Sequence, residues 1–307
     1  GRGTFITSQE KRKAQKIVVM TTFISDYIFP SIIRGIEEIL SETGFILTLF
    51  STTNNKNREA QNFEVLRNQE IAGLIIEPTR SAEKNINISY FKELEKKRIP
   101  YIFIHASYPD LDPAYVLLDD EKGMYIATKY IIHLGHKNIA GLFKIDDIQG
   151  INRQNGFMKA IYEQGILQNN ELIGRFETRH LASFPYQFTK ELLRKKESPT
   201  AIVCYNDWVA IRVMQAIRDL GLKIPNDISI IGFDDSTLAV ATEIKLTTIK
   251  HPKEEMGRQV ARMLIDMIYQ KIEKPRFIFQ PELVVRDSCL EFKMKNHSDL
   301  RHQIFSS

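Results

Sequence analysis

Apolar runs of strand length alternate with helical patterns along most of the chain. The runs cover residues 17–20, 45–50, 71–76, 101–104, 139–143, 201–205 and 228–233. Most of them are apolar at every position instead of at alternate positions, which is typical of parallel strands covered by helices on both faces. The pattern therefore predicts an α/β fold with mainly parallel sheets.

Two of the intervening stretches show clear helical spacing. In Pro30–Leu40, apolar residues recur on one face, and Gly44 follows as a stop signal before the next strand. Asp207–Leu220 repeats this arrangement, with Asp207 able to cap the helix and Gly221 ending it. The strand, the helix and the glycine stop thus follow one another in the order that a parallel sheet requires.

The number of strands predicts two lobes instead of one. Seven runs precede residue 234, which is more than one compact sheet needs at this spacing. The polar segment 144–150 interrupts the alternation, and we place the break between the lobes there. We assign residues 16–145 and 252–280 to an N-terminal lobe, residues 146–251 and 281–292 to a C-terminal lobe, and residues 293–307 to a disordered polar tail.

Composition and charge exclude several classes of protein. Hydrophobic residues make up 43% of the chain and charged residues 26%, which excludes wholesale disorder. A net charge of +4 predicts no strongly basic face, so we expect no DNA binding by these residues alone. Two cysteines are too few for a disulfide framework or a four-cysteine zinc site. No apolar run is long enough to span a bilayer, so we expect a cytoplasmic protein with no membrane partner.

Signatures of enzymes are missing. The sequence has no phosphate-binding P-loop, no G-x-G-x-x-G after a strand, no G-x-S-x-G and no H-E-x-x-H. The carboxylate pairs Asp146-Asp147 and Asp234-Asp235 are adjacent in sequence, so their side chains diverge and do not indicate a general acid/base pair. We predict that the protein is not an enzyme and needs neither a cofactor nor a metal.

Ligands of α/β sheets bind beyond the carboxyl ends of the strands. Those ends carry carboxylates, amides, basic groups and aromatic rings, found in the segments 26–27, 77–80, 105–108, 144–149, 206–208 and 234–235. Each sugar hydroxyl both donates and accepts, and an aromatic ring packs on the C–H face of a sugar, so this mixture is typical of a sugar site. Such a site rejects analogues that leave its buried polar groups unpaired.

Several of these residues also have a structural interpretation. Helix capping would explain Asp207 and the pair Asp119-Asp120. Packing against the core would explain Tyr27 and Trp208, and Arg153 lies on a helical stretch where a solvated arginine is the simple alternative. Composition and pattern alone therefore predict a polar cleft without naming its ligand.

Six segments resemble the effector-binding domain of LacI-type repressors and occur in the order of that family. They are LGHKNIAGLF (134–143), RQNGF (153–157), SPTAIVCYND (198–207), LGLKIPNDISIIGFDD (220–235), LTTIKHP (246–252) and PELVVRDS (281–288). The resemblance covers the chain from about Lys16 to Ser288. It implies two similar lobes of the periplasmic-binding-protein type, each a parallel sheet flanked by helices. Three crossovers would join the lobes, a sugar would bind between them, and a homodimer would form along them.

The opening residues GRGTF are similar to the last strand of a winged-helix domain of the GntR type, although a cloning remnant is the alternative. A GntR-type head fused to a LacI-type sensor is the arrangement of the arabinose repressors, and the segments IIRGIEEILSETG, LIIEPTRSA, FKIDDIQG and CYND are similar to that group. The resemblance implies that residues 1–15 end the winged-helix domain and its linker. It also implies that the absent head binds operator DNA, and that L-arabinose or a related pentose releases the dimer from it.

The resemblance also ranks the polar residues. Arg153 occupies the position of the family's sugar-clamping arginine, where a planar guanidinium can hold two adjacent hydroxyls. Asn206 and Asp234 match other pocket positions, and His251 lies where the family commonly has a polar group at the last crossover. Strand-end geometry and likeness to the arabinose repressors add Tyr27, Glu77, Arg80, His105, Tyr108, Lys144, Asp146, Gln149, Asp207 and Trp208.

Two other functions stay open at this point. A sugar-binding protein of a transport system shares the two-lobed architecture, but it would be an exported monomer. A pentose-processing enzyme, such as a glycosidase, would form a product from arabinosides, whereas a sensor returns its ligand unchanged.

Overall fold

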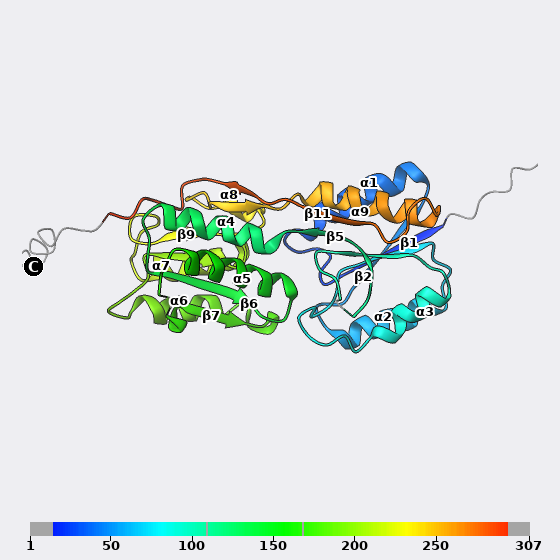
Figure 1. Ribbon diagram of the computed structural model, residues 1–307, viewed down its shortest axis with the longest axis horizontal. Helices are drawn as coiled ribbons and strands as arrows, with labels where there is room; N and C mark the ends of the chain where they lie inside the picture. Colours follow the sequence, from blue (N-terminus) through cyan, green and yellow to red (C-terminus); the bar gives the residue numbers. More distant parts are fainter. Residues whose placement is uncertain (1–14, 109, 168, 294–307) are drawn as a thin grey trace, which may run out of the picture.

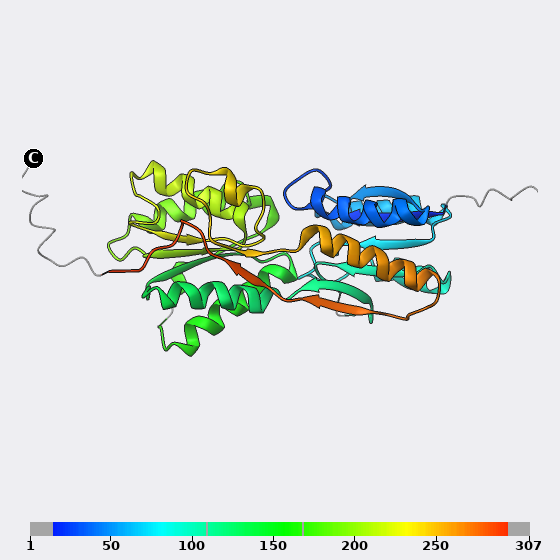
Figure 2. The ribbon, with the colours of Figure 1, turned by 90° about the horizontal axis from the view of Figure 1, so that it is seen from above.

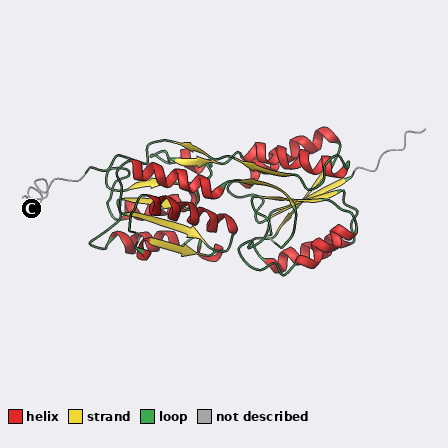
Figure 3. Cartoon of the chain, viewed as in Figure 1, coloured by secondary structure: helices red, strands yellow, loops and turns green. Residues whose placement is uncertain are grey.

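Two lobes, each built on a parallel β-sheet, lie side by side along the long axis of the molecule (Figure 1). The computed structural model describes residues 15–108, 110–167 and 169–293. The first lobe contains β1 (Lys16–Thr21), β2 (Ile46–Ser51), β3 (Gly73–Ile76), β4 (Tyr101–Ile104), β5 (Ala114–Leu118) and β11 (Arg276–Phe279), in the order β11-β5-β4-β3-β1-β2. The second lobe contains β6 (Ile139–Lys144), β7 (Ile173–Phe176), β8 (Ala201–Cys204) and β9 (Ser229–Ile231), in the order β7-β6-β8-β9. Figure 3 shows the helices that flank both sheets, and the predicted α/β fold with two parallel-sheet lobes is confirmed.

Helices cover both faces of the first sheet. Helices α1 (Phe29–Thr43) and α9 (Lys253–Ile268) lie on one face, and α2 (Lys56–Arg67) and α3 (Ile88–Lys96) lie on the other (Figure 1). Successive residues of β1 point to opposite faces of the sheet. Ile17 and Val19 pack in the cluster of α1 and α9, while Val18 and Met20 pack in the cluster of α2 and α3. This double burial is the physical reason why the strand is apolar at every position.

The second sheet is covered in the same way. Helices α4 (Asp120–His133) and α5 (Ile148–Glu163) pack with Phe143 and Val203 on one face, while α6 (Phe184–Leu193) and α7 (Asp207–Asp219) pack with Leu142 and Ile202 on the other. Smaller elements of this lobe are the antiparallel pair β10 (Thr248–Lys250) and β12 (Glu282–Val284), helix α8 (Leu238–Ala241), and the short 3₁₀ turns Asn170–Leu172 and Thr178–His180. No helix within the described ranges is both long and apolar enough to cross a membrane.

The chain passes between the lobes three times. The crossovers are residue 119 between β5 and α4, residues 251–252 between β10 and α9, and residues 280–281 between β11 and β12. Backbone contact joins the first and third of them, because Asp119 N donates to Phe279 O at 3.1 Å. The three connections that the family resemblance implies are therefore present.

The first crossover comes earlier than the sequence analysis placed it. Helix α4 packs against α5, and β6 pairs with β7 and β8. Residues 120–144 therefore lie in the second lobe, and the predicted break at 144–150 is wrong. That polar segment is instead the loop at the carboxyl end of β6, which leads into α5. The predictions for residues 1–14 and 294–307 concern residues outside those that the structure describes.

In the part of the chain before residue 234, the apolar pattern missed two strands and located the glycine stops correctly. Strand β7 was missed because Gly174 and Arg175 interrupt its apolar run, and β5 was not assigned although it is apolar throughout. Gly44 and Gly221 follow α1 and α7 with φ angles of 77° and 73°, a left-handed conformation that glycine adopts without strain. Both glycines end their helices as predicted.

Helices α1 and α9 lie against each other along their length (Figure 2). A Cβ atom on Gly35 would lie 2.1 Å from the carbonyl oxygen of Glu254, and a Cβ on Gly257 would lie 2.2 Å from that of Ile32. The two glycines therefore allow backbone to touch backbone. This close packing fixes the start of α9, next to the second crossover, within the first lobe.

Candidate functional site

A cavity of about 620 Å³ lies between the lobes, beyond the carboxyl ends of strands from both sheets. This volume falls within the range that is usual for small-molecule sites. The first lobe contributes Thr22, Phe23, Ser25, Asp26, Tyr27, Ile28, Phe29, Asn54, Glu77, Pro78 and His105. The second lobe contributes Lys144, Asp147, Gln149, Arg153, Thr178, Leu181, Tyr205, Asn206, Trp208, Asp234, Thr237 and Leu238.

The structure brings most of the predicted site residues together in this cavity. Its lining includes Arg153, Asn206, Asp234, Tyr27, Glu77, His105, Lys144, Gln149 and Trp208. The remaining predicted residues, Arg80, Tyr108, Asp146, Asp207 and His251, surround the cavity without lining it. Their contacts are described below, because they show what these side chains do instead.

Arg153 is buried in the wall of the cavity, so the solvated alternative is wrong. Its Nε donates to Asp120 Oδ1 at 2.7 Å, Nη1 to the carbonyl oxygen of Tyr205 at 2.8 Å, and Nη2 to Asp234 Oδ1 at 3.1 Å. The guanidinium also lies 3.7 Å from the centre of the Phe233 ring. Within the described ranges these contacts use three of the five N–H donors of the arginine, which leaves two for a ligand.

Asp120 holds Arg153 in place and was not recognised as a site residue. Capping at the start of α4 comes from its neighbour Asp119, whose Oδ1 accepts from Lys122 N at 3.0 Å. Burial raises the pKa of Asp120 to about 6, although the charge of Arg153 opposes that shift. The interpretation of the Asp119-Asp120 pair as capping therefore applies to Asp119 alone.

The first-lobe wall contains a carboxylate with fixed orientation. Glu77 Oε2 accepts from the backbone N of Thr22 at 2.7 Å and from its hydroxyl at 2.5 Å. Glu77 Oε1 lies 3.1 Å from His105 Nδ1, so the carboxylate accepts a hydrogen bond from the His105 ring. The three side chains come from the ends of β1, β3 and β4, and they present a polar surface to the cavity.

Lys144 contributes a charge that is already balanced. Its Nζ lies 2.8 Å from Asp147 Oδ2 and 3.6 Å from Asp146 Oδ1. Burial opposes the charge of Lys144, but Asp147 and Asp146 more than offset it, so the pKa of Lys144 is raised. Asp147 also caps α5 by accepting from Gly150 N at 2.7 Å, and it accepts from the Tyr205 hydroxyl at 2.8 Å.

Asn206, not Asp207, caps α7. Asn206 Oδ1 accepts from Val209 N at 2.9 Å, while its side-chain NH₂ makes no hydrogen bond within the described part of the chain. Asp207 is fully buried and accepts from Ser236 N at 2.7 Å and from the Thr248 hydroxyl at 2.6 Å. Burial, followed by the charge of Asp234, raises the pKa of Asp207 to about 7. Neither interpretation of Asp207, as a cap or as a cavity residue, matches the structure.

Arg80 and Asp146 connect the lobes instead of lining the cavity. Arg80 Nη2 lies 3.2 Å from Glu177 Oε2, and its Nη1 lies 3.5 Å from Asp146 Oδ2. Asp146 Oδ2 also accepts from Asn54 Nδ2 at 3.4 Å and from Thr178 N at 2.9 Å. These contacts at the edge of the cleft pair the charges of Arg80 and Asp146.

Tyr108 and His251 are buried outside the cavity. The Tyr108 hydroxyl donates to the carbonyl oxygen of Thr79 at 2.9 Å, on the side of the sheet that carries α2 and α3. His251 lies in the second crossover with its ring centre 5.2 Å from that of His105, and neither ring nitrogen has a hydrogen-bond partner among the residues that the structure describes. Burial, then the neighbouring His105, lowers the pKa of His251 well below its usual value. His251 therefore packs behind the cavity wall.

Some lining residues escaped the sequence analysis. Thr22 directly follows β1 and Tyr205 directly follows β8, so the strand-end rule could have found both. Asn54 follows β2 at a short distance. Thr178, Leu181, Thr237 and Leu238 come from short turns and α8, and no periodic signal marks them.

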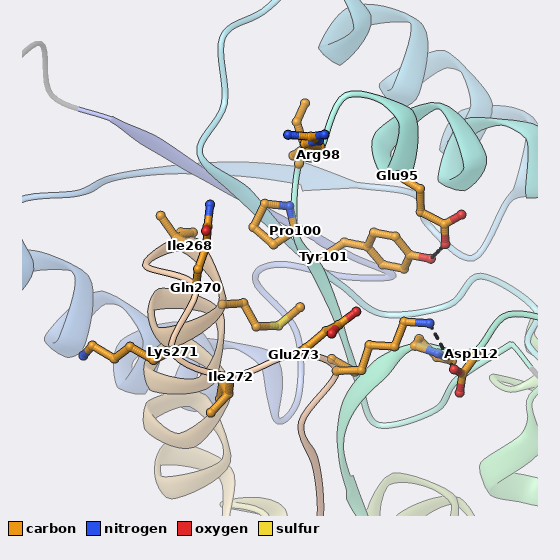
Figure 4. Close-up of a pocket in the computed structure, with 15 residues that line it drawn as sticks. Glu95, Arg98, Pro100, Tyr101, Asp112, Ile268, Gln270, Lys271, Ile272 and Glu273 are labelled. Carbon is orange, nitrogen blue, oxygen red and sulfur yellow. Dashed lines mark hydrogen bonds and ion pairs between the residues drawn. The ribbon is translucent and has the colours of Figure 1, made fainter.

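A second cavity, of about 610 Å³, lies at the end of the first sheet that is remote from the inter-lobe cavity (Figure 4). It is bounded by the start of β4 and by the residues that follow α9. Two pairs of its polar groups already contact each other, since the Tyr101 hydroxyl donates to Glu95 at 2.8 Å and Lys274 lies 3.0 Å from Asp112. This cavity faces the amino ends of the strands and contains none of the predicted residues, so the inter-lobe cavity is the candidate site.

The candidate site gives no indication of a metal. Among the residues that the structure describes, no three histidine, cysteine or acidic side chains are placed to hold a metal ion. Each buried carboxylate of the wall instead meets hydrogen-bond donors of the chain. The arrangement suits recognition of hydroxyl groups by many fixed donors and acceptors.

Comparisons with known proteins agree with this geometry. Residues 128–289 match the family model of a periplasmic binding protein-like domain. The chain is 46% identical over 298 residues to an arabinose metabolism transcriptional repressor of Geobacillus stearothermophilus and 43% identical over 307 residues to a repressor of the same name from Halalkalibacterium halodurans. Both alignments cover 95% of this chain and 82% of the relative. A solved LacI family regulator of Enterococcus faecium with bound ribose has a TM-score of 0.77 and 26% identity, covering 91% of this chain and 100% of that one.

Proposed function

We propose, because the chain belongs to the LacI-type family of transcriptional regulators with a periplasmic binding protein-like domain, that it senses L-arabinose or a related pentose between its lobes. Its relatives are transcriptional repressors and regulators, and this confirms the prediction that the chain is not an enzyme. The alternative of a transport protein loses support for the same reason.

The charges of the cavity favour a neutral ligand. The lining carries the carboxylates of Asp26, Glu77, Asp147 and Asp234. Within the described lining the cations are Lys144 and Arg153, and each already pairs with buried carboxylates. A phosphorylated sugar would therefore meet more negative than free positive charge, whereas the hydroxyls of a neutral sugar match the donors and acceptors present.

The observation that carries the proposal is the environment of Arg153. This side chain is fixed by Asp120, Asp234 and the Tyr205 carbonyl group, and it keeps two N–H donors for a ligand. Fixed, parallel donors select vicinal hydroxyls, because a bidentate contact needs both oxygens at once. Asp234 adds an acceptor, and Trp208 and Phe23 add flat apolar surfaces to the same cavity.

The identity of the sugar is supported by likeness to the relatives. Two relatives at 46% and 43% identity are arabinose metabolism repressors, and the resemblance of individual segments pointed to the same group. The related solved structure from Enterococcus faecium holds ribose, which is also a pentose. These names favour a pentose over a hexose or a disaccharide.

The proposal includes a cytoplasmic homodimer with a DNA-binding head of the GntR type preceding Gly1. The likeness of GRGTF to a winged-helix strand supports this head, which would bind operator DNA mostly through its phosphates. Sugar can change operator affinity only to the extent that it favours one arrangement of the lobes, and the coupling is reciprocal. Direct contacts between the lobes support this mechanism: the Tyr27 hydroxyl donates to the Phe233 carbonyl oxygen at 3.2 Å.

Calorimetric titration tests the proposed function. L-Arabinose, D-xylose, D-ribose, D-galactose and L-arabinose 5-phosphate are added in turn, with the fluorescence of Trp208 as a second signal on the same samples. Saturable binding of L-arabinose, with weak or no binding of its phosphate, is the expected result. Binding of another neutral sugar alone would keep the sensor and change its effector, and absence of binding to every sugar would contradict the proposal.

A further inference from the structure

The turn after β9 carries two consecutive residues with left-handed backbone conformations. Asp234 has a φ of 97° and Asp235 a φ of 45°. Residues with a Cβ atom adopt such angles only where the surrounding structure holds them there. The Asp234 carboxylate lines the cavity and accepts from Arg153, so this strained turn sets the position of a candidate sugar-binding group.

The side chain of Lys253 holds this turn. Its Nζ donates to the carbonyl oxygens of Asp234 at 2.8 Å, Asp235 at 2.7 Å and His251 at 3.2 Å. The three contacts match the three N–H donors of an ammonium group. Lys253 is the first residue of α9, where the helix dipole disfavours a positive charge. The contacts of Lys253 with the three carbonyl groups therefore explain why a lysine occupies this position, whereas the stability of the helix does not.

Lys253 and the turn that it holds belong to different lobes. Helix α9 packs on α1 and on β3, β4 and β5 of the first lobe, with backbone contact at Gly35 and Gly257. Asp234 and Asp235 follow β9 in the second lobe. A rotation of the lobes about the second crossover therefore displaces the ammonium group relative to the turn.

A second cation fixes the same turn from within its own lobe. Arg286 Nη2 donates to Asp235 Oδ1 at 2.6 Å, and Nη1 donates to the Leu246 carbonyl oxygen at 2.9 Å. Arg286 follows β12, which pairs with β10 in the second lobe. Asp235 is thus held by contacts within the second lobe. Lys253 links the carbonyl groups of Asp234 and Asp235 to the first lobe.

We infer that Lys253 is a positioning residue that couples the arrangement of the lobes to the orientation of Asp234 in the sugar site. This inference rests on the proposed function, since it assigns a role in sugar affinity to a residue that does not line the cavity. Lys253→Met keeps an unbranched side chain that is one atom shorter, and it removes the ammonium group with its three hydrogen bonds. We expect it to lower sugar affinity about tenfold or more, through Asp234 and not through lost contact with the sugar.

Two measurements on the whole chain test the inference, with Lys250→Met as the matched control. Lys250 lies three residues away and makes an exposed ion pair with Glu282, at 3.1 Å. The first measurement needs no sugar: hydrogen exchange followed by mass spectrometry on peptides that cover residues 230–240. Lys253→Met should speed exchange there, and Lys250→Met should leave it unchanged. The second measurement is the affinity of both variants for the sugar that binds the unsubstituted chain.

The outcomes separate this inference from the proposed function. Faster exchange together with weaker sugar binding in Lys253→Met alone supports the coupling. Unchanged exchange overturns the inference whether or not any sugar binds, and faster exchange with undiminished affinity overturns it as well. If the unsubstituted chain binds no sugar, the proposed function fails and the affinity role of Lys253 fails with it, while the exchange result still decides whether Lys253 holds the turn.

Discussion

Arg80 of the first lobe reaches Glu177 of the second lobe, with 3.2 Å between Nη2 and Oε2. This ion pair lies beside the contacts of Asp146 with Asn54 and Thr178, so one edge of the cleft is closed by polar groups. The two residues are distant in sequence and belong to different sheets. Their pairing therefore favours the arrangement in which the lobes enclose the cavity.

Glu177→Gln should weaken sugar binding by a modest factor. Both side chains are partly exposed, so the ion pair contributes on the order of 1 kcal/mol or less to the closed arrangement, which predicts a loss of about two- to fivefold in affinity. Calorimetry on the variant measures this loss. Glu171→Gln, which removes an exposed ion pair with Lys195 remote from the cleft, serves as the control. Equal affinities of Glu177→Gln and the unsubstituted chain would show that this contact does not influence closure.

Arg153→Lys should abolish sugar binding and destabilise the second lobe. A lysine cannot reproduce the contacts of Arg153 with Asp120, Asp234 and the Tyr205 carbonyl group, so at least one buried carboxylate loses its partner. Breaking a buried pair in this way costs about 3 kcal/mol or more. Urea unfolding and calorimetric titration measure the two effects, and Arg175→Lys on the exposed side of β7 is the control. Sugar affinity within tenfold of the unsubstituted chain would contradict the assigned role of Arg153.

The contribution of Asp207 to the stability of the protein should fall as the pH rises from about 4 to about 7. Burial raises the pKa of this carboxyl from 3.8 to about 7, so the folded state binds its proton more tightly than the unfolded state does. The contribution is therefore fully present below the unfolded value and is lost as the pH passes through the folded value, with a slope of up to about 1.4 kcal/mol per pH unit.

Asp207→Asn isolates this contribution from those of other carboxyl groups. The amide is neutral at every pH, and the Thr248 hydroxyl can accept from it as well as donate to the carboxylate. The difference in free energy of unfolding between the two proteins, measured by urea denaturation at several pH values, should grow in favour of the variant between pH 4 and pH 7. A difference that does not depend on pH would mean that Asp207 stays ionised throughout this range.

Gly35→Ala should destabilise the protein although alanine is the better helix former. The added Cβ would lie 2.1 Å from the Glu254 carbonyl oxygen, so α1 and α9 must separate. Overpacking of this kind costs about 1–3 kcal/mol, which exceeds the gain of up to about 1 kcal/mol in helix propensity. Thermal unfolding measures the net loss, and the exposed Ser41→Ala on the same helix is the control. A melting temperature at or above that of the unsubstituted chain would show that the helices can move apart without cost.

The sequence predicted the fold because burial on two faces leaves a local trace. Most strands that are covered by helices on both sides are apolar at nearly every position, as Val18 and Val19 illustrate, and helices such as α1 are followed by a glycine stop, as Gly44 shows. The boundary between the lobes left no such trace. The first crossover is the single residue Asp119, and the short charged run 119–122 that it opens is equally typical of the start of a helix, whereas the longer polar run at 144–150 is a loop within the second lobe.

The sequence by itself determined most of the strands, their alternation with helices, and which strand ends carry polar groups, because these depend on neighbours along the chain. Only the tertiary structure decided which of those polar groups meet. Arg80, Asp146 and Asp207 follow strands just as Glu77 and Asp234 do, yet their charges are taken up by partners that other elements supply. Lys253 is the first residue of a helix, yet it contacts the candidate site. Its local sequence does not indicate that its ammonium group donates to the carbonyl oxygens of Asp234 and Asp235. Which side chains remain for a ligand depends on hydrogen bonds between distant segments, and those bonds form only when the two lobes have folded and come together.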